Sequence, residues 1–312
     1  MGPKKKDGIK EKRLDAGESI KQSFKELRTM ILLKGKFTSP ILKKPKFIDS
    51  FQIKLLNIKI NKFKPKIKFA IDVRDFVVKT AETPDELRKV LRLRYDVFSK
   101  EFNVKLKFQD LDFDRYDLTG DHLLVVRKST SEVLATYRIQ CTEFTDSFYS
   151  ENEFHLKNFL AIPGIKIELG RACVHESFRT GMLISLVWRG LANYATLSKA
   201  DYMFGCTSIN TTDPQESMAV YRSLEREGVM SDEFGISPTD DYRYDNYPEL
   251  VPTNMIDAAP EMIPSLFRSY LKAGAKVHGL PAYDREFNCI DFFTTLEVKN
   301  LNQQYVKRFF NP

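Results

Sequence analysis

The sequence predicts an α/β fold in which one mixed, mostly antiparallel sheet is covered by helices on both faces. A hairpin of two strand-like runs comes early, and strand-like and helical runs alternate in the second half of the chain. Antiparallel pairing followed by such alternation is typical of a mixed sheet with helices on either side.

Five helices are predicted, and the first ones begin with capping motifs. Thr83 is followed by proline at the first helical position and by Glu86 three residues later, which forms a capping box. Ser150 and Glu153 have the same spacing. The predicted helices span residues 84–102, 150–159, 182–198, 213–228 and 260–274.

The strand-like run from Ile165 to Val174 is the centre of the predicted sheet. Its alternation is interrupted at Gly170, and a glycine inside a strand marks a bulge or a close backbone approach. Glu168 and Arg171 flank that glycine, and burying either charge alone is costly. On these residues alone, a structural ion pair and a catalytic site both stay open. The other predicted strands span residues 123–127, 133–142, 202–206, 275–280 and 288–296.

Composition excludes several classes of protein. The chain has 312 residues, of which 42% are hydrophobic, and no apolar run approaches the roughly 18 residues of a membrane span. The lysine-rich start is not followed by the apolar stretch of a signal peptide, so we expect a cytoplasmic protein. The four cysteines and four histidines are scattered without ligand spacing, so we expect no metal site and no disulfide framework.

Charge divides the chain into a basic N-terminal arm, which we expect to be partly disordered and partly amphipathic, and a mildly acidic body. Residues 1–70 hold 20 Lys and Arg against 6 Asp and Glu, and the remaining residues hold 29 against 36. Lysines interleaved with apolar residues suit adsorption to anionic lipid, at about 1 kcal/mol per lysine near the surface. A solvated or domain-packing arm is the second interpretation, and nucleic acid is the third. An acidic carrier protein is a further possible partner.

Residues from about 80 to 312 carry an ordered set of motifs. They are Arg94-Tyr95-Asp96-Val97-Phe98 with Glu101; Asp112, Asp114 and Asp117; Asp121-His122-Leu123; Thr136-Tyr137-Arg138; Tyr149-Ser150-Glu151 with Phe154; Glu168-Leu169-Gly170-Arg171; Phe204-Gly205-Cys206; Leu271-Lys272-Ala273-Gly274-Ala275; Gly279; and Pro281-Ala282-Tyr283-Asp284 with Phe287 and Asp291. The set resembles the haemolysin-like GNAT N-acyltransferases that make lyso-ornithine lipid from acyl carrier protein thioesters. It is more distantly similar to acyl-homoserine lactone synthases and N-acyl amino acid synthases. The resemblance implies a GNAT-like fold for residues 71–312.

The resemblance also implies roles for single residues. Glu168 matches a carboxylate suited to accept a proton from the attacking amine, with Arg171 as the second catalytic residue. Phe98 is expected beside the thioester and the acyl chain. The residues expected to orient the acceptor and to shape the helix and loop beside it are Arg94, Asp114, Asp117 and Arg138. The residues expected in the acyl and pantetheine region are Val174, Arg179, Thr180, Gly181 and Met182.

The loop at residues 179–181 and the helix predicted after it bear on the identity of the acyl donor. Arg179-Thr180-Gly181 resembles only the beginning of the glycine-rich loop that holds a pyrophosphate, which makes acyl-CoA a less suitable donor than acyl carrier protein. The apolar helix after it could line an acyl tunnel, but we expect ordinary core packing. Its residues in question are Met182, Leu183, Leu186, Val187 and Trp188.

We therefore expect an N-acyltransferase that moves a long acyl group, possibly 3-hydroxylated, from acyl carrier protein to the α-amine of an amino acid. L-ornithine is the leading acceptor, the product is a lyso-aminolipid, and no cofactor is expected. Such an enzyme would work on the inner face of the cytoplasmic membrane, with residues 1–70 on the anionic surface. The alternatives are another acceptor, such as glycine or tyrosine, and a non-catalytic lipid- or nucleic-acid-binding protein on a GNAT scaffold.

Overall fold

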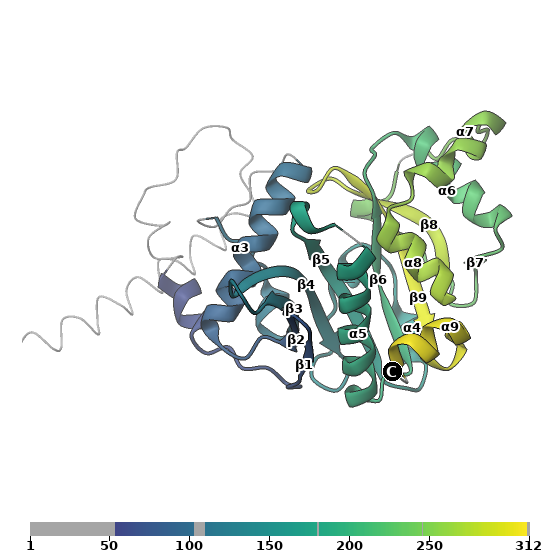
Figure 1. The fold of residues 1–312 in the computed structure, drawn as a ribbon. Helices are drawn as coiled ribbons and strands as arrows, with labels where there is room; N and C mark the ends of the chain where they lie inside the picture. Colours follow the sequence, from purple (N-terminus) through teal and green to yellow (C-terminus); the bar gives the residue numbers. More distant parts are fainter. Residues whose placement is uncertain (1–53, 103–109, 180, 245, 311–312) are drawn as a thin grey trace, which may run out of the picture. The chain divides into compact units, whose positions relative to one another are not determined.

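A computed structural model describes residues 54–102, 110–179, 181–244 and 246–310 (Figure 1). These residues form a sheet of nine strands. The strands are β1 (Ala70–Val73), β2 (Phe76–Thr80), β3 (Asp121–Arg127), β4 (Glu132–Cys141), β5 (Lys166–Val174), β6 (Tyr202–Ile209), β7 (Met230–Ser231), β8 (Lys276–Asp284) and β9 (Cys289–Glu297). Their order in space is β1-β2-β3-β4-β5-β6-β9-β8-β7, and only β5–β6 and β7–β8 are parallel pairs.

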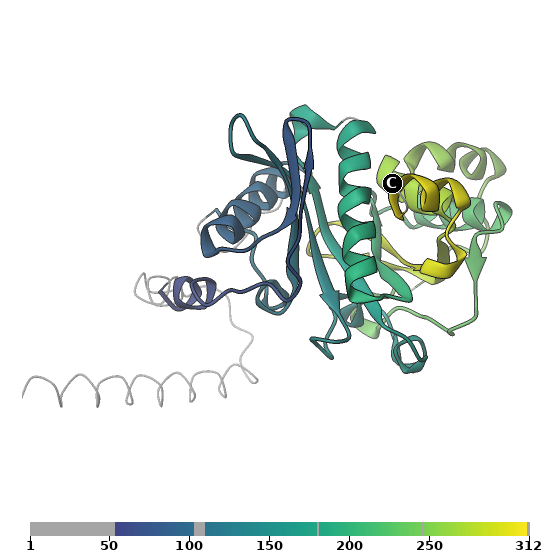
Figure 2. The same ribbon diagram turned by 60° about the horizontal axis from the view of Figure 1, so that its bottom comes forward.

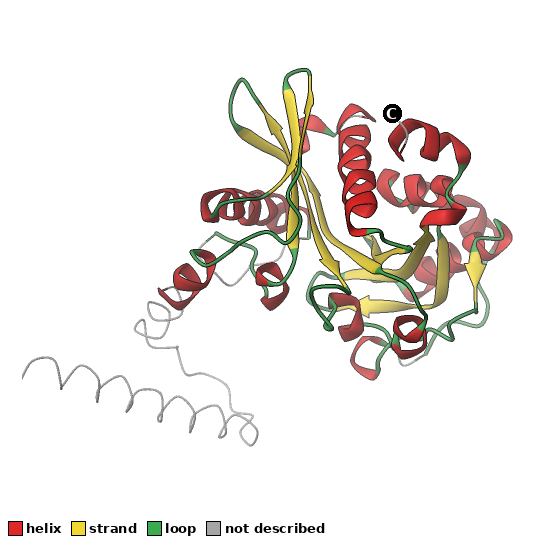
Figure 3. Ribbon diagram, turned by 90° about the horizontal axis from the view of Figure 1, so that it is seen from below, coloured by secondary structure: helices red, strands yellow, loops and turns green. Residues whose placement is uncertain are grey.

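Helices cover both faces of the sheet. They are α3 (Pro84–Glu101), α4 (Lys157–Ala161), α5 (Gly181–Ser198), α6 (Pro214–Arg226), α7 (Thr253–Ala258), α8 (Ser265–Ala273) and α9 (Gln303–Tyr305). Side chains of β3 alternate between the faces, so that Leu123 and Val125 share a core with α5 while Leu124 shares one with α3. Figure 2 shows α3 and α5 on opposite sides of the strands, and Figure 3 shows helices along both faces of the curved sheet. The predicted mixed sheet with helices on both faces is confirmed.

Helix α3 begins as its capping motif predicts. The Thr83 hydroxyl accepts a hydrogen bond from the backbone N–H of Glu86 at 3.2 Å, and Pro84 opens the helix. The helix ends at Glu101 with Phe102 as its C-cap. Its apolar face is buried at Leu87, Val90, Leu91, Val97 and Phe98.

The helix predicted over residues 150–159 is not formed as one element. Tyr149–Asn152 makes a single 3₁₀ turn, and α4 follows as a separate helix. Glu151 closes the turn by accepting the backbone N–H of Phe148 at 2.8 Å, whereas Glu153 is fully buried. The prediction was wrong because Glu151 caps this turn instead of Glu153, and because the backbone N–H groups of Tyr149 and Ser150 donate to Glu168 on β5.

The helix predicted over residues 260–274 is interrupted at Pro264. Ile263 has an extended backbone (ψ 120°), as expected for a residue that precedes proline. Ala259–Met262 forms a 3₁₀ turn and α8 begins after the proline. The predicted end is confirmed, since Gly274 terminates α8 in the left-handed conformation (φ 107°).

Strands β5 and β6 separate after a short stretch of pairing. Lys166–Glu168 pairs in parallel with Tyr202–Phe204, and the pairing of the two strands ends there. On its other side β5 meets β4 through a bulge, where Arg171 has a φ of 51°. The irregularity predicted at Gly170 is thus present, although the left-handed residue is the arginine. The sheet opens just after Glu168.

The compact unit that contains the sheet begins at Gln52. It therefore includes the last part of the segment that was interpreted as a basic arm. Residues 54–60 are helical, and Leu56, Ile60 and Phe63 are buried against α3. The Asp121 carboxylate then accepts the backbone N–H groups of Lys66 and Ile67 at 2.7 and 2.9 Å. The predictions for residues 1–53 lie outside the described residues. None of the helices in the described part of the chain combines the length and the hydropathy needed to cross a membrane.

Candidate active site

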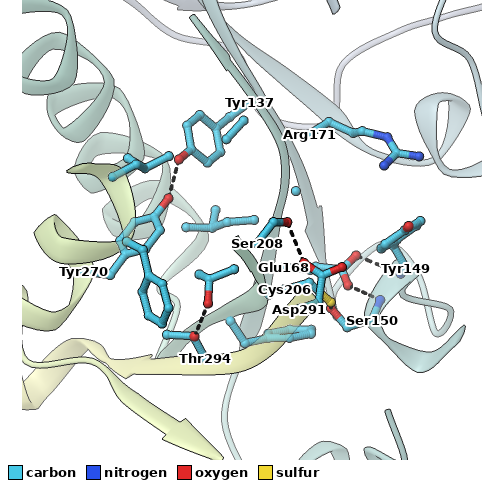
Figure 4. A pocket seen from close by; sticks show the side chains of 18 of the residues that line it. Tyr137, Tyr149, Ser150, Glu168, Arg171, Cys206, Ser208, Tyr270, Asp291 and Thr294 are labelled. Carbon is cyan, nitrogen blue, oxygen red and sulfur yellow. Dashed lines mark hydrogen bonds between the residues drawn. The ribbon is translucent and has the colours of Figure 1, made fainter. Parts of the chain in front are cut away.

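A cavity of about 240 Å³ lies where β5 and β6 separate (Figure 4). Its two ends differ in chemistry. The polar lobe is lined by Tyr149, Ser150, Glu168, Arg171, Cys206, Ser208, Asp284 and Asp291. The apolar lobe is lined by Tyr137, Trp188, Met203, Leu266, Phe267, Tyr270 and Leu296. A cavity with these two ends can hold a hydrocarbon chain beside a polar reacting centre.

Glu168 faces the polar lobe from β5 and is only 2% exposed. Its carboxylate oxygens accept the backbone N–H groups of Tyr149 and Ser150 at 2.9 and 2.7 Å. Burial raises the pKa of Glu168, although the hydrogen bonds from Ser150 and Tyr149 oppose the shift. The carboxylate also lines the cavity, so a bound molecule can deliver a proton to it.

Arg171 lies in the polar lobe between two aromatic rings. Its guanidinium carbon is 4.8 Å from the ring centroids of both Tyr149 and Phe287. One Nη donates to Asp114 at 3.2 Å, and Nε is 3.6 Å from Asp112 without forming a hydrogen bond. The bulge in β5 therefore directs a cation into the cavity and leaves one of its donors unused.

Beside the cavity, three arginines and three aspartates form a buried arginine–aspartate network: Arg94, Arg138, Arg171, Asp112, Asp114 and Asp117. Arg94 donates to Asp112 and Asp117 at 2.6 Å each, and Arg138 donates to Asp114 at 2.6 Å. Burial disfavours the charge on Asp117, but Arg94 and Arg138 hold its pKa below the ordinary value. The opposite charges in the network balance.

Some residues of the network line the cavity, and the others support them from outside the cavity wall. Arg138 and Arg171 line the cavity, whereas Arg94 is completely buried behind them. Asp114 and Asp117 contact the arginines and are not part of the cavity wall. These residues hold Arg138 and Arg171 in place, and the prediction that they also orient the acceptor stays a prediction.

Phe98 lines the cavity from α3, where the resemblance predicts contact with a thioester. Its ring lies edge-on to the rings of Phe102 and Phe287, with centroids 5.9 and 6.1 Å apart. These three rings form an apolar wall next to Arg171. A long-chain thioester could pass along this wall into the apolar lobe.

Four of the residues predicted for the acyl and pantetheine region, Val174, Arg179, Gly181 and Met182, lie outside the cavity wall. Arg179 forms an ion pair with Glu101 and donates to the carbonyl of Val174. Gly181 begins α5, and Thr180 is outside the described residues. Met182 is half exposed and borders a separate hollow beside Arg74 and Arg189. Glu101, which pairs with Arg179, does line the cavity.

The expectation that α5 packs as ordinary core is confirmed for most of its apolar face. Leu183, Leu186, Val187 and Trp188 are buried in one cluster with the sheet. Trp188 also borders the apolar lobe, where its ring is edge-on to that of Tyr270. The apolar lobe is therefore built mainly from strands and α8, with one contribution from α5.

No role was predicted for three further acids at the polar lobe, Glu153, Asp284 and Asp291. Asp284 and Asp291 end and interrupt apolar strands, and Glu153 lies beside them fully buried. Burial, with its neighbours Asp291 and Asp284, raises the pKa of Glu153 well above the ordinary value, and burial raises the pKa of Asp291 to about 6. An acid inside the run Cys289-Ile290-Asp291-Phe292-Phe293 is the signal that could have found the site.

Asp284, Cys289 and Asp291 are the residues best placed to hold a metal ion, since their ligand atoms all lie within 4.8 Å of one another. However, Asp284 already accepts the backbone N–H groups of Glu286 and Phe287, and Asp291 accepts the Ser208 hydroxyl. Burial also raises the pKa of the Cys289 thiol, and a protonated thiol is a poor ligand. This donor set fits a metal ion poorly.

Comparisons with known proteins agree with the fold. Residues 93–189, which include Glu168 and Arg171, match the acetyltransferase (GNAT) domain family. The chain is 28% identical over 245 residues to an L-ornithine N(alpha)-acyltransferase from Agrobacterium fabrum, covering 73% of this chain and 83% of that protein. It is 28% identical over 254 residues to the protein of the same name from Rhizobium meliloti, covering 76% and 85%.

A solved structure with a similar arrangement is that of FeeM, an N-acyl amino acid synthase from uncultured soil microbes. It is 10% identical, with a TM-score of 0.43 over 72% of this chain and 93% of that chain. The domain match and the two relatives decide the class of protein. The chain is an acyltransferase with a GNAT domain.

Proposed function

We propose that this acyltransferase transfers a long acyl group from a thioester to the α-amine of an amino acid, with L-ornithine as the leading acceptor. The observation that carries the proposal is the position of Glu168, a buried carboxylate where a polar lobe meets an apolar lobe in one cavity. The similarity to proteins named L-ornithine N(alpha)-acyltransferase supports the acceptor. The product is a lyso-aminolipid.

The chemistry requires a proton acceptor beside the amine. The amine nitrogen attacks the thioester carbonyl, the C–N bond forms, and the C–S bond breaks to release a thiolate. Glu168 accepts the proton of the amine, through a water molecule, and the thiol product takes up a proton as it leaves. The raised pKa of Glu168 suits this role, because it brings the carboxylate closer to the pH of the reaction.

Arg171 is the group proposed to hold the acceptor's carboxylate. Its Nε is buried without a hydrogen bond, and a buried donor of this kind is costly unless a ligand pairs with it. The Nη2 atom of Arg138 is likewise buried without a hydrogen-bond partner. A guanidinium can pair with a carboxylate through two donors at once, which fixes the direction of the amine.

Acyl carrier protein is proposed as the donor in preference to acyl-CoA. The start of α5 lacks the full glycine-rich loop for a pyrophosphate, and Arg179 is paired with Glu101. Exposed lysines lie along residues 54–68, before β1, between residues that are buried against the core. These lysines are Lys54, Lys59, Lys62, Lys64, Lys66 and Lys68. They suit an acidic protein or an anionic lipid surface.

We also propose that residues 1–70 attach the enzyme to the inner face of the cytoplasmic membrane, where its lipid product would remain. The basic composition of the segment supports this location, and the test is binding to vesicles with and without anionic lipid. Binding that needs anionic lipid and weakens with salt supports the proposal. Equal binding to RNA, or no binding to vesicles, contradicts it.

The acyl-transfer proposal is tested by product analysis. The purified protein is incubated with palmitoyl-acyl carrier protein or palmitoyl-CoA and an equimolar mixture of amino acids, and the products are identified by mass spectrometry. Nα-acylornithine formed faster from the carrier-bound donor supports the proposal. N-acylglycine or N-acyltyrosine as the main product would change the acceptor, and the absence of any N-acyl amino acid contradicts the function.

A further inference from the structure

The polar lobe ends in three acidic side chains that we call the acid pocket: Glu153, Asp284 and Asp291. Asp291 projects from β9, and its carboxylate accepts the Ser208 hydroxyl at 2.5 Å. Asp284, at the end of β8, accepts the Tyr149 hydroxyl at 3.5 Å. Both are 3% exposed or less and line the cavity, and Figure 4 shows Asp291 next to Glu168 and Ser208.

Glu153 is the unusual member of the acid pocket. It is completely buried, and the side chains beside its carboxyl group are those of Asp291, Cys206 and Tyr149. It faces Asp291 and Asp284, whose charges, together with burial, raise its pKa well above the ordinary value. Buried carboxyl groups this close together repel one another when they are charged, so a bound cation would stabilise them.

No basic side chain in the described part of the chain forms an ion pair with the acid pocket, although the charge of Arg171 acts on Asp291 from a distance. The basic side chains that line the cavity there are Arg138 and Arg171, and both already pair with Asp114. The arginine–aspartate network is balanced within itself. The cavity wall therefore carries three carboxyl groups, those of Glu168, Asp284 and Asp291, and Glu153 is buried beside them.

We propose that the acid pocket binds the side-chain ammonium of the acceptor and so selects amino acids with a cationic side chain. This inference rests on the proposed function and names the group that decides its acceptor. An ammonium has three donors and can pair with both Asp284 and Asp291, the two members of the acid pocket that line the cavity. A neutral side chain would leave these carboxylates buried and unpaired, which costs binding energy.

The acid pocket and the proposed base are joined by a short path through the protein. Ser150 donates its backbone N–H to Glu168, and the Cys206 thiol contacts the Ser150 hydroxyl at 3.4 Å. Cys206 in turn lies against Glu153. One acceptor molecule can thus present its α-amine to Glu168 and its side-chain ammonium to the acid pocket within the same lobe.

The first experiment compares two acceptors of equal length with the wild-type enzyme. L-ornithine and L-norleucine differ in that a methyl group replaces the terminal ammonium. We expect kcat/KM for ornithine to exceed that for norleucine by about 100-fold or more, as for sites that hydrogen-bond a buried substrate group. Equal values for the two acceptors overturn the inference but leave the N-acyltransferase function intact. Acylation of no amino acid overturns both.

The second experiment changes the acid pocket and measures the same ratio. Asp291→Asn and, separately, Glu153→Gln should each lower the preference for ornithine over norleucine by about tenfold or more, because an amide cannot pair with an ammonium as a carboxylate does. Asp146→Asn, at an exposed aspartate outside the cavity, is the matched control. Damage to folding would lower the acylation rates of both acceptors by the same factor and leave their ratio unchanged. A loss of preference therefore reports on the acid pocket itself, and an unchanged ratio in both variants overturns the inference. If one variant does not fold, the other and the wild-type ratio still decide.

A metal ion is the competing ligand for the same carboxylates. Elemental analysis of the purified protein should find no stoichiometric metal, and chelator treatment should not change the ornithine preference. One metal ion per chain that is lost in Asp291→Asn would overturn the inference.

Discussion

A Cβ atom on Gly205 would lie 2.3 Å from the carbonyl oxygen of Leu169. These two residues sit on β6 and β5 at the point where the strands stop pairing. The absence of a side chain lets the backbones approach closely before they separate. The cavity therefore depends on a glycine at the junction.

Gly205→Ala should distort this junction and lower stability by about 1–3 kcal/mol, the usual cost of overpacking. It should also lower acyl transfer, because Leu169 and Gly205 both line the cavity. Thermal or urea unfolding measures the first effect. Gly181→Ala is the control for stability, since no atom lies within 4 Å of its added Cβ. Unfolding of Gly205→Ala at the wild-type midpoint would contradict the account of the junction.

Arg94 should contribute to stability through its buried partners. Arg94→Met leaves Asp112 and Asp117 buried without this cation, which costs about 3–5 kcal/mol. Arg92→Met is the matched control on the same helix, because Arg92 is half exposed in its pairs with Asp96 and Asp110. Urea unfolding should show a large loss for the first variant and none for the second. Equal effects would show that the network adds nothing beyond a surface pair.

The acid pocket should make the ligand-free protein less stable as the pH rises. Burial raises the pKa of Asp291 from 3.8 to about 6, so the folded state binds more protons than the unfolded state between these values. Stability from this group is present at low pH and is lost as the pH rises toward the folded pKa. Melting temperatures from pH 4 to pH 7 should therefore fall less in Asp291→Asn than in Asp146→Asn. Parallel curves would contradict the shift.

Filling the apolar lobe should shorten the acyl group that is accepted. Leu266 borders this lobe from α8, so Leu266→Trp should move the preferred donor toward shorter chains. The measurement is the relative rate with donors of increasing chain length. Leu250→Trp, at a residue 86% exposed and outside the cavity, should keep the wild-type preference. An unchanged preference in Leu266→Trp would place the acyl chain elsewhere.

Much of the fold was predictable because local signals and packing agree. Capping at Thr83 and the glycine stop at Gly274 have short-range causes, and the structure follows them. The two mistaken helices have a different cause. Glu168, distant in sequence, holds the backbone N–H groups of the 149–152 turn, and Pro264 overrides helical periodicity.

The site was predictable in part. The resemblance singled out Glu168, Arg171, Arg138 and Phe98, and all four line one cavity. The role of Asp291 could not be predicted, because only the fold shows that β9 brings it to the wall that holds Glu168. In the same way, the burial of Leu56 and Ile60 depends on where the chain before β1 packs, and charge composition does not reveal this.

The most direct test of the account is the rate of Nα-acylornithine formation by the wild-type enzyme and by Glu168→Gln, with palmitoyl-acyl carrier protein as donor. We expect the wild type to form this product. The variant should form it at least about 100-fold more slowly, since general base catalysis contributes about 10²–10⁴-fold to the rate. The loss should shrink at high pH, where the free amine is already present. Product formation by Glu168→Gln at the wild-type rate across the pH range would contradict the role of Glu168.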